Sequence, residues 1–153
     1  MYDLTTNQDV FISNVYSFNT NSLTWNIPAN IKGTSPNNRL FINSVMDDTG
    51  KMYIFGGNSN TTLVFNDMVI LDTVESTWSI IILANSPNKR VGYTATLLSN
   101  GVIAYIGGWE YIENVRQDVN IKQINLYDTK SSTWSMKVCM NVIYNLLIIP
   151  FLK

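Results

Sequence analysis

Two arginines and two aspartates stand at matching positions of a repeating sequence and are the first candidates for chemistry in this chain. Arg39 and Arg90 are 51 residues apart, and each follows a turn cluster that contains Pro-Asn. A guanidinium can bind an acidic ligand or donate hydrogen bonds to backbone carbonyls of a neighbouring unit, and we favour the second role. Asp67 and Asp118 precede the third apolar run of their units. We expect these carboxylates to cap loops, because acid–base roles require close carboxylate pairs.

A segment of mixed chemistry, residues 109–118, is the candidate for binding a partner. It contains Trp109, Tyr111 and Arg116 together with acidic residues. Aromatic and arginine side chains are enriched in protein interfaces, so this composition suits a protein-binding surface. The alternative is that Trp109 and Ile112 pack on a neighbouring unit while the charged side chains are solvated. The sequence leaves both interpretations open.

Histidine is absent from the sequence. This excludes Ser-His-Asp and Cys-His catalysis by these residues, and it removes the commonest ligand of transition metals. We therefore assign no catalytic, cofactor-binding or metal-binding residue and expect no cofactor. The formal net charge is −1 and there is no basic run, which argues against nucleic acid as a partner. Cys139 is the single cysteine, so an internal disulfide is excluded.

One short pattern occurs three times and indicates which elements position these residues. It reads Asn or Asp, Thr, three variable residues and then Thr-Trp, and its tryptophans are 53 and 56 residues apart. Two Gly-Gly pairs keep the same phase, 51 residues apart. Self-similarity with a period near 50 predicts a repeat architecture. The residues of the structural motif are Trp25, Gly56, Gly57, Asp72, Trp78, Gly107, Gly108, Asp128 and Trp134.

Each unit is predicted to form four antiparallel strands. Residues 94–99 and 102–106 are rich in β-branched and aromatic side chains, and the Asn-Gly between them is a strong hairpin signal. The runs before each Asp-Thr and around each Trp supply the third and fourth strands. Four antiparallel strands make one blade of a β-propeller. We expect the glycine pairs to allow close backbone approach and the tryptophans to wedge between neighbouring blades.

The second full unit is longer than the first. The interval from the glycine pair to the following aspartate is 15 residues in the first unit and 20 in the second. The extra five residues fall within residues 109–118. Loops on a propeller face tolerate insertions and are the usual place for recognition, which strengthens the interest of this segment.

The order of Gly-Gly, Asp and Trp resembles the kelch repeat over about residues 10–138. This resemblance implies an all-β fold of antiparallel four-stranded blades, here about two and a half blades in a ring that is not closed. Family members form propellers of commonly six or seven blades and usually serve as protein-interaction platforms, and their arginines at positions like Arg39 and Arg90 often lie near the central channel. Galactose-oxidase-type members bind copper through histidine and tyrosine, a site that this chain cannot assemble from its own residues.

The expected organisation has four parts. A partial blade occupies residues 1–30, two kelch blades occupy 31–84 and 85–138, and an apolar tail occupies 139–153. The repeat stops after the third tryptophan, and residues 142–152 are too short to span a bilayer, which needs about 20 residues. The tail packs on the last blade, lies outside the fold, or associates with a membrane. Open blade edges favour self-association, or a chain that is a piece of a longer propeller.

The leading functional hypothesis is therefore a non-catalytic kelch module that binds a protein partner and belongs to a larger propeller. One alternative is the remnant of a galactose-oxidase-like enzyme that lacks its catalytic residues. Another is an ectodomain piece of a membrane-tethered kelch protein. The sequence shows no signal peptide pattern, so we expect a cytoplasmic location by default.

Overall fold

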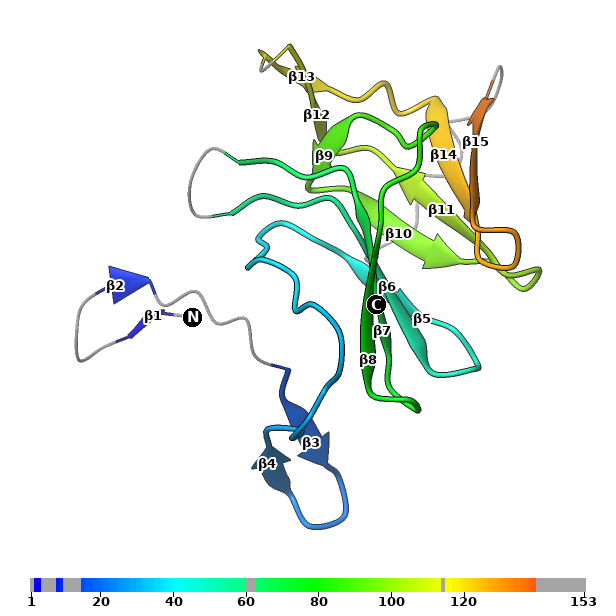
Figure 1. Ribbon diagram of the computed structural model, residues 1–153. Helices are drawn as coiled ribbons and strands as arrows, with labels where there is room; N and C mark the ends of the chain where they lie inside the picture. The colour runs from blue at the N-terminus through cyan, green and yellow to red at the C-terminus, as the bar shows by residue number, and fades with distance from the viewer. Residues whose placement is uncertain (1, 4–7, 10–14, 60–62, 114, 140–153) are drawn as a thin grey trace, which may run out of the picture.

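The structure is a computed structural model that describes residues 2–3, 8–9, 15–59, 63–113 and 115–139. Within these residues every regular element is a β-strand. The strands form two four-stranded antiparallel sheets and three smaller ones (Figure 1). This confirms the predicted all-β fold built from antiparallel blades.

Two sheets have the predicted blade topology, with strands in chain order across each sheet. We call them the first blade and the second blade. The first blade consists of β5 (Ser44–Met46), β6 (Lys51–Phe55), β7 (Met68–Asp72) and β8 (Thr77–Ile81). The second blade consists of β10 (Thr94–Leu97), β11 (Val102–Ile106), β14 (Gln123–Asp128) and β15 (Thr133–Val138).

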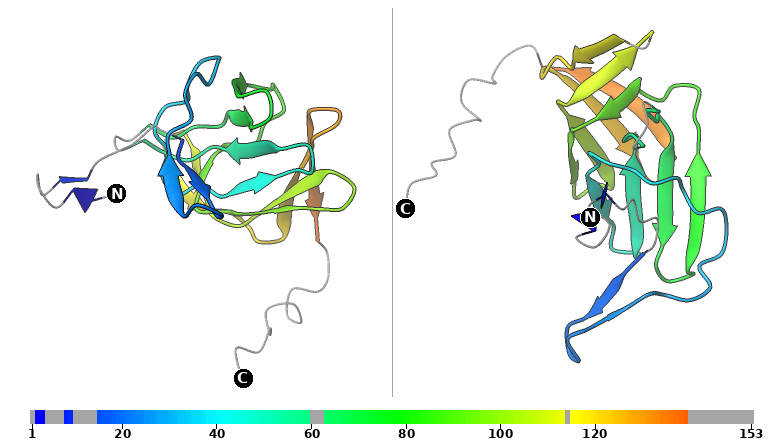
Figure 2. Two further views of the ribbon diagram at one scale, coloured as in Figure 1. Left: turned by 90° about the horizontal axis from the view of Figure 1, so that it is seen from below. Right: turned by 90° about the vertical axis from the view of Figure 1, so that its left-hand side faces the viewer.

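The smaller sheets lie around the blades (Figure 2). The strands β9, β12 and β13 form a three-stranded sheet next to the second blade, where residues 109–118 fold into a hairpin. The predicted loop insertion is therefore itself β-structure. The bounds of these strands are β1 (Tyr2–Asp3), β2 (Gln8–Asp9), β3 (Ser17–Asn19), β4 (Thr24–Asn26), β9 (Lys89–Val91), β12 (Trp109–Ile112) and β13 (Val115–Asp118).

The repeated Asn/Asp-Thr pattern has a local physical cause. The carboxylate of Asp72 accepts hydrogen bonds from the amides of Val74 and Glu75 at 3.0 and 2.8 Å, which caps the turn into β8. The next residue in the pattern, Thr73, donates its hydroxyl to the carbonyl of Gly50 at 2.7 Å and so ties this turn to the β5–β6 hairpin. The other two turns are capped in the same way by Asn19 and Asp128.

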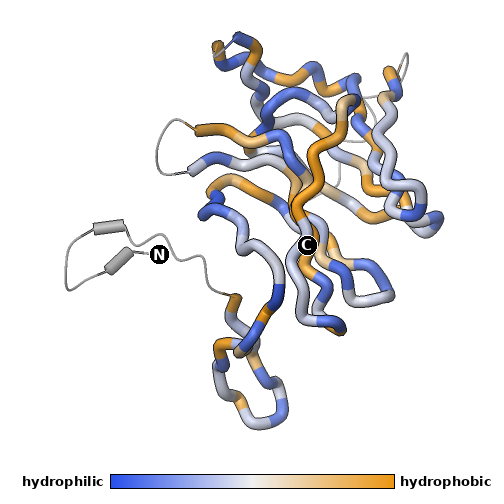
Figure 3. Tube along the Cα trace, viewed as in Figure 1, coloured by the Kyte–Doolittle hydropathy of each residue, from blue (hydrophilic) through white to orange (hydrophobic). Residues whose placement is uncertain are grey.

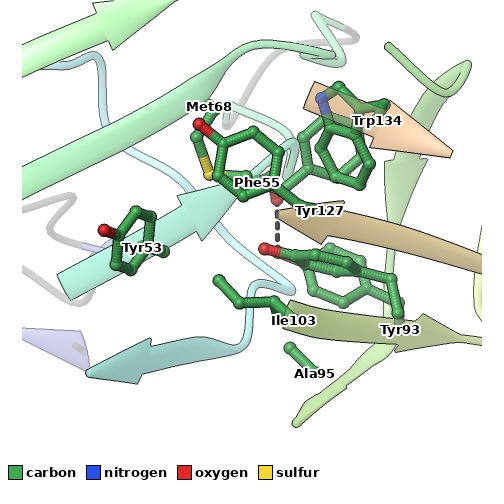
Figure 4. Packing of buried hydrophobic residues seen from close by; sticks show 9 residues of the cluster. Tyr53, Phe55, Met68, Tyr93, Ala95, Ile103, Tyr127 and Trp134 are labelled. Carbon is green, nitrogen blue, oxygen red and sulfur yellow. Dashed lines mark hydrogen bonds between the residues drawn. The ribbon is translucent and has the colours of Figure 1, made fainter. Parts of the chain in front are cut away.

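The hydrophobic core lies between the two blades (Figure 4). The Trp134 ring is 4.7 Å from the Phe55 ring across this interface and 5.0 and 5.2 Å from Tyr127 and Tyr105 of its own blade. Figure 3 shows a further hydrophobic stretch where β8 continues into the next connection. The buried cluster comprises Tyr53, Phe55, Met68, Tyr93, Ala95, Ile103, Tyr105, Tyr127 and Trp134.

The three tryptophans of the repeat occupy different environments. Trp134 is 6% exposed and wedges between the blades as expected, whereas Trp25 is 68% exposed. The ring of Trp25 packs on Phe18 within the β3–β4 hairpin, 4.9 Å between centroids. The expected wedge role is therefore wrong for Trp25 in this structure.

The boundaries of the four predicted parts stay a prediction, and the apolar tail beyond Cys139 lies outside the described residues.

The Gly-Gly pairs permit close contact between neighbouring backbones. The amide of Gly57 donates to the carbonyl of Arg90 at 2.8 Å, which joins the first blade to the chain entering the second. A Cβ at Gly56 would lie 2.5 Å from the same carbonyl oxygen. Only glycine fits this approach, because any larger residue would push the two segments apart.

The second pair offers a matched test of this explanation. A Cβ at Gly108, which has φ +84°, would lie 2.4 Å from the carbonyl oxygen of Val91, whereas one at Gly107, with φ +67°, would meet nothing within 4 Å. We expect Gly108→Ala to lower the free energy of unfolding by about 3 kcal/mol and Gly107→Ala by about 1 kcal/mol, the cost of positive φ alone. Urea denaturation followed by circular dichroism measures both. Equal losses would contradict the steric explanation.

Candidate functional site

The β12–β13 hairpin gathers the sequence-predicted residues Trp109, Tyr111 and Arg116. Tyr111 is paired with Arg116 across the hairpin, and Trp109 is paired with Asp118. Because cross-strand partners share a face, these side chains stand on one side of the small sheet. The guanidinium carbon of Arg116 lies 3.9 Å from the centre of the Trp109 ring, a cation–π contact. The hairpin thus forms one continuous aromatic and cationic surface.

The tip and outer strand of the hairpin are open to solvent. Val115 is 59% exposed and Ile112 is 38% exposed. The whole of β13 is exposed, while Trp109 and Tyr111 are half-buried. The alternative, in which Trp109 and Ile112 pack on a neighbouring unit, stays a prediction, since Ile112 is partly exposed and Trp109 is half-buried. Large half-buried aromatic rings beside exposed polar groups are typical of a binding surface.

Gly92 sets the position of the tryptophan. It precedes β10, and a Cβ there would lie 2.9 Å from Cζ3 of Trp109. The ring therefore rests directly on the backbone of the connection into the second blade. Gly92 was not among the functional residues predicted from the sequence, although a lone glycine inside a strand-like run signals a close approach of this kind.

A buried polar network supports the hairpin from its other face. Arg90 is 2% exposed, and its guanidinium lies 3.8 Å from the Glu110 carboxylate. When the Asn125 amide is oriented with its oxygen toward the arginine, that oxygen accepts from Nη2 at 2.8 Å and Nη1 at 2.9 Å. Burial lowers the pKa of Arg90, and the negative charge of Glu110 opposes this shift. Asn88 donates to Glu110 at 3.1 Å, which holds the carboxylate in place.

The equivalent arginine of the first unit, Arg39, makes a closer ion pair than Arg90 does. Arg39 donates from both terminal nitrogens to the two oxygens of Asp67, at 2.6 and 2.7 Å. It also donates to the carbonyl of Gly56 at 2.7 Å and lies 4.2 Å from the centre of the Phe65 ring. The side chain is 4% exposed. Asp67 therefore pairs with an arginine instead of only capping its loop.

These observations separate the predicted site residues into two groups. Trp109, Tyr111 and Arg116 lie together on the hairpin. The guanidinium groups of Arg39 and Arg90 are buried and bond to partners in their own units, so the favoured prediction of bonds to backbone carbonyls of a neighbouring unit is wrong for the contacts in the described residues. The hairpin residues are available to a partner. For the two arginines we propose a supporting role, in which they hold the strands that carry this surface.

Tyr93 connects the blades beneath the site. Its hydroxyl donates to the carbonyls of Phe55 and, at 3.2 Å, of Asn43, both from the first blade and its entry segment (Figure 4). Burial raises the pKa of Tyr93 to about 12, against the opposing effects of these hydrogen bonds and of the nearby arginines. The hydroxyl therefore stays protonated over the physiological range and serves as a permanent donor.

A concave region lies at the turn end of the blades, between the β5–β6 and β10–β11 turns. It is a cleft of about 480 Å³ lined by Lys51, Tyr53, Ser99 and Lys130 together with Asp47 and neighbouring residues. The Asp47 carboxylate already accepts hydrogen bonds from the amides of Thr49 and Lys51 and from the hydroxyl of Tyr53.

In the described part of the chain, no three His, Cys, Asp or Glu side chains are grouped to hold a metal. The same residues contain no helix long and apolar enough to cross a membrane.

Comparison with known proteins identifies relatives of the repeat. The family model described as the KLHDC2/KLHL20/DRC7 Kelch-repeats domain matches residues 5–144. Human Kelch domain-containing protein 3 is 30% identical over 125 residues, covering 78% of this chain and 32% of that protein. Kelch repeat protein B10 of vaccinia virus (strain Ankara) is 30% identical over 107 residues, covering 69% of this chain and 60% of that protein.

Structural comparison supports the same fold. The solved structure titled "Structure of YjhT" matches with a TM-score of 0.57 at 17% sequence identity, covering 75% of this chain and 40% of that chain. At this identity the match shows the fold alone. The chain spans about a third of the length of the Kelch domain-containing relatives that it matches.

Proposed function

The chain belongs to the kelch-repeat family, and from this premise we propose that it is a non-catalytic module that binds a protein partner through the β12–β13 hairpin. The stack of Arg116 on Trp109, at 3.9 Å, is the observation that carries the proposal. It places a large ring and a cation together on a projecting, solvent-facing hairpin. Tryptophan, tyrosine and arginine are the residues that dominate binding energy at protein interfaces.

Rigidity of the surface supports this role. The hairpin pairs with β9, so its inner strand has neighbours on both sides. The Trp109 ring rests on Gly92, and Glu110 is held by Asn88 and faces the buried Arg90. A surface that is ordered before binding loses little conformational entropy when a partner docks, which favours affinity.

The absence of histidine from the sequence supports a non-catalytic role, because the commonest general base and metal ligand is missing. We further propose that the module works as part of a larger propeller. Its match to only 32% of the length of Kelch domain-containing protein 3 is consistent with that arrangement. The partner in this proposal is a protein, since the near-neutral chain has no basic run to neutralise phosphates.

Quantitative affinity purification from native extract, with three forms of the full chain as bait, tests the proposal. The forms are the wild type, the hairpin variant Tyr111→Ala/Arg116→Ala, and the matched control Val74→Ala/Glu75→Ala on an exposed turn of the first blade. We expect a protein that is enriched by the wild type and the control but lost with the hairpin variant. The purified protein should then bind the hairpin variant at least tenfold more weakly, because interface hot spots contribute about 2 kcal/mol or more.

Two outcomes would contradict the proposal. In one, every protein recovered binds the hairpin variant and the wild type equally. In the other, no protein distinguishes the wild type from the hairpin variant at any bait concentration. Circular dichroism of the variants provides the folding control, because Tyr111 and Arg116 contribute little to the buried cluster.

A further inference from the structure

The contact between the two blades shows how one blade of this chain recognises the next. The first blade contributes Tyr53, Phe55 and Met68, and the second blade receives them with Tyr105 and Trp134, among others. We call the contributing side of a blade its outgoing face and the receiving side its incoming face. The Phe55 ring lies 4.7 Å from the ring of Trp134 and 5.7 Å from that of Tyr105, and the Tyr53 ring lies 6.1 Å from that of Tyr127.

The first blade carries its own incoming face. The repeat relates Tyr105 to Ile54 and Trp134 to Trp78. Strand pairing puts Met52, Leu71 and Trp78 on one side of the sheet, since Met52 is paired with Leu71 and Leu71 with Trp78. These residues line one wall of a mostly apolar groove of about 260 Å³, whose other wall is formed by Val15, residues 36–39 and Ile42 of the same chain. In the repeat, this groove corresponds to the site that Phe55 occupies on the second blade, and among the described residues no other blade packs into it.

The second blade carries its own outgoing face. The repeat relates Tyr53 to Ala104 and Phe55 to Ile106. Ala104 is paired with Leu126, and Ile106 with Ile124, so these four side chains share one side of the sheet, opposite Tyr105 and Trp134. None of the four belongs to the buried cluster between the blades. They form an apolar strip between Thr96 on one side and Ser135 and Lys137 on the other, with smaller side chains than its counterpart on the first blade.

We propose that a second copy of this chain fills the groove, with the outgoing face of its second blade packed on the incoming face of the first blade. In the repeat, the two surfaces correspond to the two halves of the interface that the chain forms between its own blades. A net charge of −1 leaves little electrostatic repulsion between copies. The contact is head-to-tail, so each copy uses one face for each neighbour and assembly continues until a ring closes. Propellers have typically four to eight blades, which corresponds to two to four copies of two blades.

Complementary variants of the full chain test this proposal by sedimentation velocity over a range of concentrations. Ile54→Asp disables the incoming face, and Ile106→Asp disables the outgoing face. The wild type should show concentration-dependent assembly, whereas each variant alone should sediment as a monomer. An equimolar mixture should form a 1:1 heterodimer and nothing larger, because one intact groove meets one intact outgoing face.

Assembly of the mixture also shows that both variants are folded. Two replacement variants are available should either variant fail to fold. Ile42→Asp replaces Ile54→Asp, because the Ile42 side chain lines the groove and is 37% exposed. Thr96→Arg replaces Ile106→Asp, because Thr96 lies on the exposed part of the outgoing face. A wild type that stays monomeric at every concentration would overturn the proposal and leave the groove to a different occupant. Assembly by either variant alone, or a mixture without heterodimers, would also overturn it. The hairpin variant Tyr111→Ala/Arg116→Ala should assemble like the wild type, which separates this contact from partner binding.

Discussion

Replacing Trp134 with alanine is expected to lower the free energy of unfolding by about 3–5 kcal/mol, whereas Trp25→Ala should lower it by less than about 1 kcal/mol. Both residues end the same sequence pattern. Trp134 is 6% exposed and touches the rings of Phe55 and Tyr127, so alanine leaves a cavity between the blades. Trp25 is 68% exposed, and within the described residues its single aromatic contact is with Phe18. Replacing Trp25 with alanine therefore removes little buried surface.

Guanidinium denaturation followed by far-ultraviolet circular dichroism measures this difference, since tryptophan fluorescence itself changes in both variants. Trp134→Phe serves as a control. It keeps an aromatic ring and removes the indole N–H, which is buried and has no hydrogen-bond partner among the described residues. We expect this variant to lose much less stability than Trp134→Ala. Equal losses for Trp134→Ala and Trp25→Ala would show that the blade interface contributes little to folding.

The second large effect is expected for Asp67→Asn, which should destabilise the chain by about 3 kcal/mol at neutral pH. The substitution keeps the shape of the side chain but leaves the buried charge of Arg39 unpaired. The guanidinium is 4% exposed and now makes two short bonds to the carboxylate, at 2.6 and 2.7 Å. Water cannot readily replace the lost charge at this depth, so the desolvation cost of Arg39 is no longer offset.

Two further variants make this prediction specific. The double variant Arg39→Met/Asp67→Leu should recover most of the lost stability, because it removes both charges together. Glu110→Gln in β12 should cost only about 1 kcal/mol, since Glu110 lies 3.8 Å from Arg90 and Asn125 also bonds that arginine. Thermal and urea denaturation of the wild type, Asp67→Asn, the double variant and Glu110→Gln measure these differences in stability. A double variant no more stable than Asp67→Asn would show that the loss does not come from the unpaired charge.

Much of the scaffold could be predicted from short-range chemistry. The Asn/Asp-Thr pattern directly encodes capped turns, as the bonds from Asp72 to the amides of Val74 and Glu75 show. The Asn-Gly turn between β10 and β11 was likewise predicted, although of its two residues only Gly101, with φ +87°, has a positive φ. Such features involve residues close in the chain, so their spacing is visible in the sequence.

The partners of the arginines could not be predicted, because they depend on contacts between distant segments. Asp67 is 28 residues from Arg39, and the sequence suggested only a loop cap for it. Its counterpart Asp118 is paired with Trp109 across the hairpin. Arg90 instead contacts Glu110 and Asn125. In the first unit Asn58 forms isolated bridges with Leu40 and Val64, and in the longer second unit the equivalent pairs extend into the strands β9, β12 and β13. Residue types alone do not reveal which of several acids a buried cation will meet.

By itself the sequence determined the kelch repeat, its strand order and the exclusion of histidine-dependent chemistry, because these rest on residue identity and regular spacing. Only the tertiary structure decided which repeat tryptophan is buried, which arginines are enclosed, and that residues 109–118 form a projecting hairpin. The physical reason is burial. Equivalent residues such as Trp25 and Trp134 have the same local sequence, but their energies depend on whether a neighbouring blade covers them.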